Sequence, residues 1–228
     1  MRMQWSVSQN KIVANLRDRL SQIESQMDSA CQISGRKRNE ICLIAVTKTV
    51  PISRIQEAYD LGLRHFGESR LQEALPKIQA LPSDIHWHFI GKLQSNKLRR
   101  ASESFEVIHS IESQSQINEI SKLNSPINVL IEVNIGQEAE KSGVFEQELT
   151  KFHSSVIECK QANFRGLMAI GPNLESAELM RPYFRKLQEL NQQVGGKWLS
   201  MGMSSDFEVA IQEGATHIRI GSALFGER

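Results

Sequence analysis

The stretch ICLIAVTK, residues 41–48, decides the fold, because an almost entirely apolar run ends abruptly at a lysine. A short apolar run with polar residues on both sides is typical of a strand buried on both faces of a parallel sheet. Lys48 follows at the carboxyl end, where side chains point into the mouth of the fold. We expect burial there to disfavour the ammonium form and leave a neutral amine that can attack an aldehyde. A lysine that snorkels from a strand end is the alternative.

Short apolar runs and helical patterns alternate along the rest of the chain. The predicted strands cover residues 41–47, 63–66, 86–90, 107–109, 128–133, 163–168, 198–201 and 217–220. Helical patterns lie between them at residues 52–61, 71–81, 95–101, 114–123, 145–160, 177–194 and 206–213. Strict alternation indicates a parallel sheet, and eight strands indicate that the sheet closes into a TIM-type (β/α)8 barrel. A doubly wound open sheet is the alternative architecture.

An amphipathic helical pattern precedes the first strand. Between residues 7 and 33, the apolar side chains recur at helical spacing, as Ile12, Val13, Leu16, Leu20 and Ile23. Nothing in the composition that follows marks a linker or a domain boundary. We therefore predict one α/β domain over residues 1–228, a single barrel with an extra N-terminal helix in an extension over residues 1–36.

The composition limits the cellular compartment and the classes of partner that we expect. With 40% hydrophobic and 23% charged residues, the 228-residue chain can bury a substantial core. A formal charge of +1 gives no reason to expect nucleic acid or a membrane surface as a partner. The cysteines Cys31, Cys42 and Cys159 lack the spacing of a disulfide framework or a zinc site. Because no apolar stretch resembles a signal peptide or a membrane span, we expect a cytoplasmic protein. We also expect a monomer.

The loop after the seventh predicted strand has the composition of a phosphate site. Gly202, Met203 and Ser204 follow that strand, and Ser205 and Glu208 have the spacing of a capping box that opens the next helix. Glycine allows close approach of the backbone, serine donates a hydrogen bond, and a helix N-terminus presents unpaired N–H groups. We predict a phosphate cradle here, with an ordinary helix cap as the alternative.

The loop after the eighth strand adds a second set of small residues. Gly221 and Ser222 follow the strand directly, and in a closed barrel this loop lies beside the preceding one. Ile218 and Ile220 share one strand face, so Arg219 points the other way. With the isoleucines packed under helices, the guanidinium would face the barrel mouth. An outward, salt-bridged arginine is the alternative.

Six segments in register resemble the pyridoxal phosphate homeostasis protein family: AVTKT at residues 45–49, FGE at 66–68, HWHFIG at 86–91, LQSNK at 93–97, SMGMS at 200–204 and RIG at 219–221. The resemblance implies a barrel similar to the barrel domain of alanine racemase, with pyridoxal 5′-phosphate (PLP) held as a Schiff base on Lys48. It places the phosphate on Ser204 and the Gly221 loop, and Arg219 near the ring or the phosphate. The implied role is to bind, buffer and deliver PLP, with apo PLP-dependent enzymes as recipients.

Two positions depart from the family pattern. Ser69 stands where the family usually has asparagine, which leaves a hydroxyl but no amide at a position expected near the cofactor. Lys92 stands where the family usually has proline, which adds a charge and removes a turn restraint. After the fifth strand, Asn134 is a further candidate for contact with the site, and Lys141 follows in the same loop.

Two other clusters have less specific patterns. His86 and His88 share one strand face, but without a third ligand of suitable spacing we expect barrel histidines and no metal site. Lys92, Lys97 and two arginines form a basic cluster without interleaved aromatic residues, which is typical of a solvated face.

We expect a carrier and not an enzyme. A PLP-dependent amino-acid racemase is the alternative, and it would need two bases on opposite faces of the substrate carbon. Lys48 can be one base; in the racemases the other comes from an additional β domain, whereas this sequence stops at Arg228. A charged Arg219 beside the ring nitrogen would also discourage ring protonation and weaken the electron sink. A cofactor-free Schiff-base aldolase is a third possibility.

Overall fold

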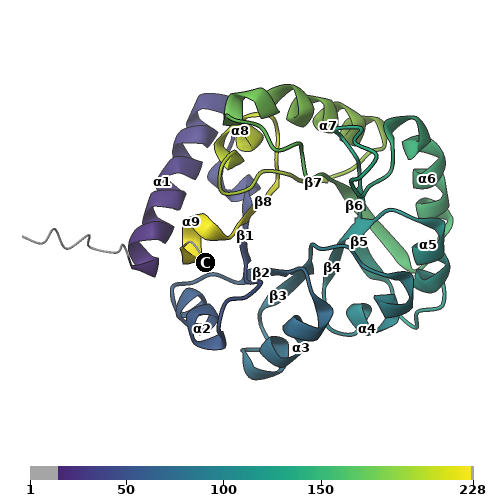
Figure 1. Ribbon diagram of the computed structural model, residues 1–228, viewed down its shortest axis with the longest axis horizontal. Coiled ribbons are helices and arrows are strands. Elements are labelled where there is room, and N and C mark those ends of the chain that lie inside the picture. The colour runs from purple at the N-terminus through teal and green to yellow at the C-terminus, as the bar shows by residue number, and fades with distance from the viewer. Residues whose placement is uncertain (1–14, 227–228) are drawn as a thin grey trace, which may run out of the picture.

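The structure, a computed structural model that describes residues 15–226, is a closed barrel of eight parallel strands in sequential order (Figure 1). Pairing of the first strand with the last closes the sheet, with Ala45 opposite Ile220. This confirms the predicted TIM-type fold and excludes the open sheet. The strands are β1 (Cys42–Val46), β2 (His65–Glu68), β3 (His86–Phe89), β4 (Val107–Ile111), β5 (Ile127–Glu132), β6 (Ala162–Met168), β7 (Trp198–Ser200) and β8 (His217–Ile220).

Helices form a shell outside the barrel (Figure 1). The predicted helix at residues 177–194 is divided, because Pro182 lies in the first turn of the longer part, where its missing N–H costs nothing. A short helix after β8 was not predicted. The helices are α1 (Leu16–Ser34), α2 (Ile52–Asp60), α3 (Leu71–Ala80), α4 (Leu98–Ser102), α5 (Gln114–Ile120), α6 (Glu146–Glu158), α7 (Arg181–Gln193), α8 (Phe207–Gln212) and α9 (Ser222–Phe225), with 3₁₀ turns η1 (Arg38–Glu40), η2 (Ser95–Lys97) and η3 (Ala177–Met180).

The extra N-terminal helix, α1, packs along α8 and α9 on the outside of the barrel (Figure 1). It begins after Asn15, whose side chain accepts a hydrogen bond from the Asp18 amide at 2.9 Å. It ends at Gly35, whose φ of 67° is the left-handed conformation that glycine adopts without a steric penalty. The apolar face predicted from residue 16 onward is buried, whereas Ile12 and Val13 lie outside the described residues.

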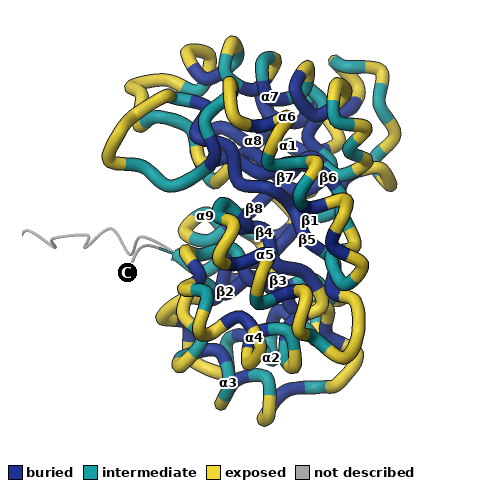
Figure 2. The backbone as a smooth tube through the Cα atoms, turned by 90° about the vertical axis from the view of Figure 1, so that its right-hand side faces the viewer, coloured by how far each residue is buried: buried dark blue, intermediate teal, exposed yellow. Residues whose placement is uncertain are grey.

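Alternation along each strand divides the side chains between two buried layers. In β1, Leu43 and Ala45 belong to the main core between sheet and helices, while Ile44 and Val46 do not and point into the barrel. A separate small cluster of Val107, Leu130 and Met168 fills part of the barrel interior. Figure 2 shows the buried strands at the centre and exposed residues on the outer turns. The same alternation decides which side chains reach the two ends of the barrel.

Candidate cofactor site

A cavity of about 590 Å³ opens at the carboxyl ends of the strands. This is the end at which barrel enzymes build their active sites. Isoleucines from two loops supply apolar walls beside the polar groups. The structure brings seven predicted site residues to this cavity: Lys48, Ser69, Met203, Ser204, Arg219, Gly221 and Ser222.

Lys48 lies two residues beyond Val46, on the strand face that points into the cavity. The preceding residue, Thr47, is buried on the opposite face, whereas Lys48 itself is exposed. The desolvation that we expected from the sequence is therefore wrong, because the amine reaches out of the strand end into open space. Within residues 15–226, no hydrogen bond or ion pair holds the Lys48 Nζ, so the amine is available to a ligand.

Ser204 connects the loops that follow β7 and β8. Its Oγ accepts hydrogen bonds from the amides of Gly221 at 3.3 Å and Ala223 at 3.2 Å. These two amides open α9, the short helix that the sequence analysis missed. The two loops therefore converge on one point in the cavity wall, where the two amides hold the Ser204 oxygen and leave its hydroxyl hydrogen to donate to an anion.

The capping box predicted at the start of α8 is wrong. The helix begins after Asp206, and no side chain caps it, although the Asp206 Oδ1 accepts a bond from the Met203 amide at 2.6 Å. Glu208 instead accepts a hydrogen bond from Gln26 of α1 at 3.1 Å. Burial raises the pKa of the Asp206 carboxyl. With this carboxyl at the start of α8, the donors available to an anion are those around Ser204.

Arg219 lies on the floor of the cavity, inside the barrel, as the strand alternation predicted. Its guanidinium donates to the Ser200 Oγ at 2.7 Å and to the Ala169 carbonyl at 2.9 Å. Burial lowers the pKa of Arg219 to about 10, which leaves the side chain charged at neutral pH. The arginine therefore supplies a fixed positive charge beneath the cavity.

A chain of hydrogen bonds runs from Arg219 down the barrel interior. Ser200 Oγ bonds to His109 Nδ1 at 3.0 Å, His109 Nε2 to His88 Nδ1 at 2.9 Å, and His88 Nε2 to His65 Nδ1 at 3.0 Å. Arginine can only donate, so the one hydrogen of Ser200 goes to His109 and each histidine donates from Nε2 toward the next. The opposite polarity would leave that hydrogen without an acceptor among residues 15–226.

The two inner histidines of this chain are neutral. Burial lowers the pKa of His88 and of His109 well below the ordinary histidine value. His88 is thus a hydrogen-bonded barrel histidine, and His86 pairs with Glu106 at 2.5 Å at the far end of the barrel. Within the described part of the chain, no group of three or more His, Cys, Asp and Glu side chains could hold a metal ion.

Glu132 is a buried carboxyl at the end of β5 that the sequence analysis missed. Burial and the nearby Glu112 raise its pKa to about 7, while the positive charge of Arg219 opposes this shift. Its side chain follows Leu130 on the strand face that points into the barrel. The signal that drew attention to Lys48, a charged residue at the carboxyl end of a buried strand, would have identified Glu132 as well.

Two predicted site residues do not line the cavity. A Cβ on Gly202, whose φ is 89°, would lie 2.5 Å from the Ala210 Cβ, so this glycine allows α8 to pack against the loop. Asn134 folds its own loop, because its amide donates to the carbonyls of Glu138 at 2.7 Å and Lys141 at 3.2 Å. The amide that we assigned to the cofactor is therefore already used within the loop.

The loops after β2 and β3 meet at the cavity wall. A Cβ on Gly91 would lie 2.4 Å from the Ser69 carbonyl oxygen, so this close approach requires glycine. Ser69 consequently lies in the cavity wall beside Gly91, although it lacks the amide of the family residue. Lys92, the other departure, is exposed and lies 3.7 Å from Glu112, outside the cavity.

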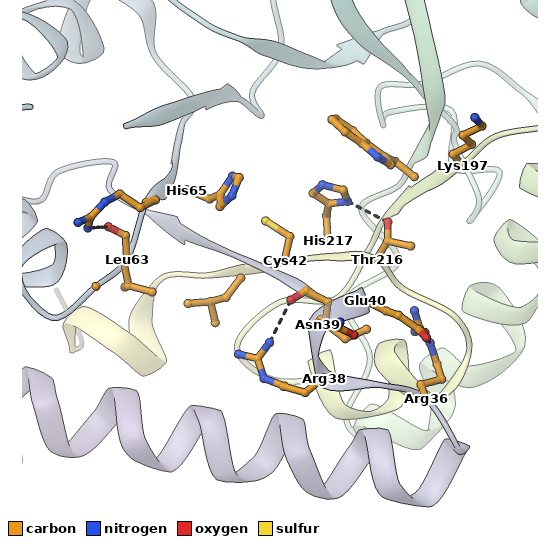
Figure 3. A pocket seen from close by; sticks show the side chains of 15 residues that line it. Arg36, Arg38, Asn39, Glu40, Cys42, Leu63, His65, Lys197, Thr216 and His217 are labelled. Carbon is orange, nitrogen blue, oxygen red and sulfur yellow. Dashed lines mark hydrogen bonds and ion pairs between the residues drawn. The ribbon is translucent and has the colours of Figure 1, made fainter. Parts of the chain in front are cut away.

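A second cavity of about 650 Å³ opens at the amino ends of the strands (Figure 3). Figure 3 shows His65 and His217 on either side of Cys42 at its inner wall, with Lys197 at the rim. The arginines around it are engaged: Arg36 donates to the carbonyls of Ile211 and Ala215. This cavity is as large as the first, and its Lys197 is an exposed lysine whose Nζ has no hydrogen bond or ion pair within residues 15–226.

Comparison with known proteins shows the family of the chain. The sequence model of the family "Alanine racemase, N-terminal domain" matches residues 19–228. The chain is 44% identical over 225 residues to the pyridoxal phosphate homeostasis protein of Aquifex aeolicus, covering 94% of this chain and 99% of that protein. No helix of residues 15–226 is long and apolar enough to cross a membrane.

Solved structures show the same barrel. PipY of Synechococcus elongatus PCC7942, solved with PLP bound, aligns with a TM-score of 0.76 at 34% identity, covering 93% of this chain and all of PipY. Alanine racemase from Corynebacterium glutamicum aligns with a TM-score of 0.67 at 19% identity, and the match covers 92% of this chain but 62% of the racemase. The second likeness concerns the fold alone. The chain therefore belongs to the pyridoxal phosphate homeostasis proteins, within the wider family of the alanine racemase N-terminal domain.

Proposed function

We propose that this protein binds PLP in the cavity at the carboxyl ends of the strands and serves PLP homeostasis as a carrier. The amine of Lys48 would condense with the aldehyde of PLP to a Schiff base and release water. The phosphate would accept a hydrogen bond from the Ser204 hydroxyl and lie against the Gly221–Ser222 loop. Apo PLP-dependent enzymes are the proposed recipients.

The observation that carries this proposal is the meeting of complementary groups in one cavity. An unpaired amine, a hydroxyl with two loop amides, and a buried cation line the same space of about 590 Å³. An aldehyde that also carries a dianionic phosphate matches the amine and the donor cluster together. Gly91 allows the loop after β3 to pack directly against Ser69, since a Cβ there would lie 2.4 Å from the Ser69 carbonyl oxygen. The residues present therefore fit PLP.

The lining of the cavity favours a carrier over a racemase. Among the described residues that line it there is no His, Tyr, Cys, Asp or Glu that could act as a second base opposite Lys48. Arg219 also places a permanent positive charge there, which disfavours a further proton on a ring nitrogen close to it. The names of the curated relatives, as homeostasis proteins, support the same proposal.

Borohydride reduction followed by peptide mapping tests the attachment. The full chain is loaded with PLP, its visible absorption is recorded, and the reduced protein is digested. We expect one PLP per chain on the peptide that contains Lys48, loss of labelling in Lys48→Ala, and full labelling in the control Lys197→Ala. Predominant labelling of Lys97 or Lys141, with Lys48→Ala still fully loaded, would contradict the proposal.

The carrier role has a separate test. Loaded protein is incubated with L-alanine in deuterated water, and exchange of the α-proton and racemisation are followed together. We expect negligible turnover, together with transfer of PLP to an added apo-enzyme. Sustained turnover above about one per second, abolished by Lys48→Ala, would favour the racemase instead.

A further inference from the structure

A second lysine, Lys77 of α3, is buried directly behind the segment that carries Lys48. Its Nζ donates to the Thr47 carbonyl at 2.7 Å, to Glu68 Oε1 at 2.8 Å and to Glu73 Oε1 at 2.7 Å. An ammonium group has three hydrogens, so these bonds use all of them. Lys77 is 6% exposed and Glu68 is fully buried, so this ion pair lies shielded in the layer between barrel and helices, while Glu73 at its edge is 25% exposed.

The bonds of Lys77 reach the backbone on both sides of Lys48. On the amino side, the ammonium holds the Thr47 carbonyl directly, and the Thr47 hydroxyl donates to Glu68 Oε1 at 2.7 Å. On the carboxyl side, the same oxygen of Glu73 that Lys77 holds also accepts a hydrogen bond from the Thr49 amide. One side chain therefore links, directly or through one carboxylate, the two peptide units that flank Lys48.

The backbone beyond Lys48 is in a conformation that needs such support. Thr49 has a φ of 61°, in the left-handed region that β-branched residues rarely adopt. A residue held there indicates that its surroundings impose the conformation. The bond from its amide to Glu73 supports this conformation, together with the turn bond from the Val50 amide to the Thr47 carbonyl at 2.9 Å.

We propose that Lys77 is a positioning residue that sets the direction of Lys48, and this rests on the proposed attachment of PLP to Lys48. Strand alternation sends Thr47 and Glu68 toward α3 while Lys48 points into the cavity. Lys77 does not line the cavity and touches no cofactor there. It acts by holding the turn after β1, so that the Lys48 amine projects into the cavity that Ser204 also lines.

The test uses two variants and a matched control. Glu73→Ala cuts the link to Thr49 and is expected to fold, because the Glu73 side chain is 25% exposed. The double variant Lys77→Met, Glu68→Gln removes the ammonium and its buried carboxylate together, so it leaves no unpaired buried charge, and it keeps the bond between Glu73 and the Thr49 amide. Glu119→Ala, which removes a helix carboxylate that pairs with a lysine three residues away, is the control far from Lys48.

Two binding readouts separate positioning from a general loss of structure. The first is the rate at which PLP becomes trappable by borohydride on Lys48; we expect it to fall about tenfold in both variants, since misplacement of a reacting group slows its reaction. The second is the affinity for pyridoxine 5′-phosphate, which lacks the aldehyde and cannot condense; we expect no change. Hydrogen exchange of the Thr49 amide should accelerate in Glu73→Ala and remain unchanged in Glu119→Ala.

The outcomes are distinguishable from failure of the proposed function. If the unmutated protein is not labelled on Lys48, the proposed attachment fails whatever Lys77 does. If it is labelled and both variants react at its rate, the positioning role is overturned. An equal loss of affinity for pyridoxine 5′-phosphate would also overturn it, because the cluster would then only stabilise the fold. Should the double variant not fold, Glu73→Ala decides alone.

Discussion

The two ends of the barrel carry cavities of similar size, about 590 Å³ at the carboxyl ends of the strands and about 650 Å³ at the amino ends. At the carboxyl end, a lysine amine is unpaired and two loop amides meet a serine hydroxyl. At the amino end, the guanidinium groups are bonded to backbone carbonyls, as in Arg36 and Arg38, or paired with carboxylates, as in Arg64. Neither volume nor an unpaired lysine chooses between the two ends, because Lys197 at the amino end also has no partner within residues 15–226. The difference is the convergence of two loops on Ser204 beside Lys48.

Between the two cavities, a chain of polar side chains shares the barrel interior with the apolar cluster of Val107, Leu130 and Met168. Three histidines, Ser200 and Arg219 form one hydrogen-bonded chain from the amino end to the floor of the carboxyl-end cavity. A buried polar network of this kind stabilises the fold only while every member is paired. The carboxyl-end cavity thus has groups that can bind a ligand, whereas the interior chain of hydrogen bonds stabilises the fold. Experiments can therefore test ligand binding and stability separately.

The largest expected effect is the loss of stability when the pH is lowered. Burial lowers the pKa of His88, His109 and His217, the last to about 3, so these histidines stay neutral in the folded protein. Unfolded histidines bind protons below about pH 6.5, so the free energy of unfolding should fall by several kcal/mol as the pH drops from there toward 4. Urea unfolding across this range measures it.

The variant His217→Leu measures how much His217 alone contributes to the loss of stability at low pH. The partner of His217, Thr216, keeps its bonds to Leu199, so the variant leaves no buried hydroxyl unpaired. We expect the slope of stability against pH to be visibly shallower in His217→Leu. An unchanged slope would mean that carboxylates elsewhere cause the acid sensitivity.

Glu132, near the carboxyl end, should show the opposite dependence on pH. Its folded pKa is raised to about 7, so its contribution to stability is complete below the ordinary glutamate pKa of 4.5 and is lost as the pH rises through 7. Because glutamine does not ionise, Glu132→Gln removes this loss of stability at higher pH. Relative to the unmutated protein, the variant should gain about 2–3 kcal/mol between pH 4.5 and 8. Parallel stability curves for the two proteins would refute the assignment; Glu140→Gln, in an exposed loop, is the control.

The smallest expected effect shows which of the two cavities binds the phosphate of PLP. Ser204→Ala removes one charge-assisted hydrogen bond and leaves the amides of Gly221 and Ala223, so PLP retention should weaken by about 1–2 kcal/mol. Lys197→Ala, at the rim of the amino-end cavity, should leave retention unchanged. Equilibrium dialysis of both variants is the measurement. A larger loss in Lys197→Ala would move the phosphate to the other end of the barrel.

Local patterns in the sequence were sufficient for the architecture and for much of the candidate site. Each strand needs only a short apolar run, and alternation with period two placed Arg219 inside the barrel and Lys48 at the strand end. Eight such strands in strict alternation with helices predicted a closed barrel, which the structure confirms. That PLP binds there stays a proposal, for which the family relationship provides support.

Other features depend on residues that are distant in the sequence. The histidine chain joins five residues between His65 and Arg219, and the contacts among them arise only when the sheet closes with its particular stagger. Lys77 looked like one position in a helical pattern, and only the packing of α3 on β1 brought it to Thr47.

The capping box, the Asn134 contact and the burial of Lys48 were local expectations that the structure does not bear out. Glu208 found Gln26 on another helix, the Asn134 amide was used within its own loop, and Lys48 extended into open space. The sequence by itself determined the strands, the faces of their side chains and the family, because these follow from short-range periodicity and motif order. Only the tertiary structure decided which polar groups are free and which are paired, because hydrogen-bond partners are chosen across the closed barrel.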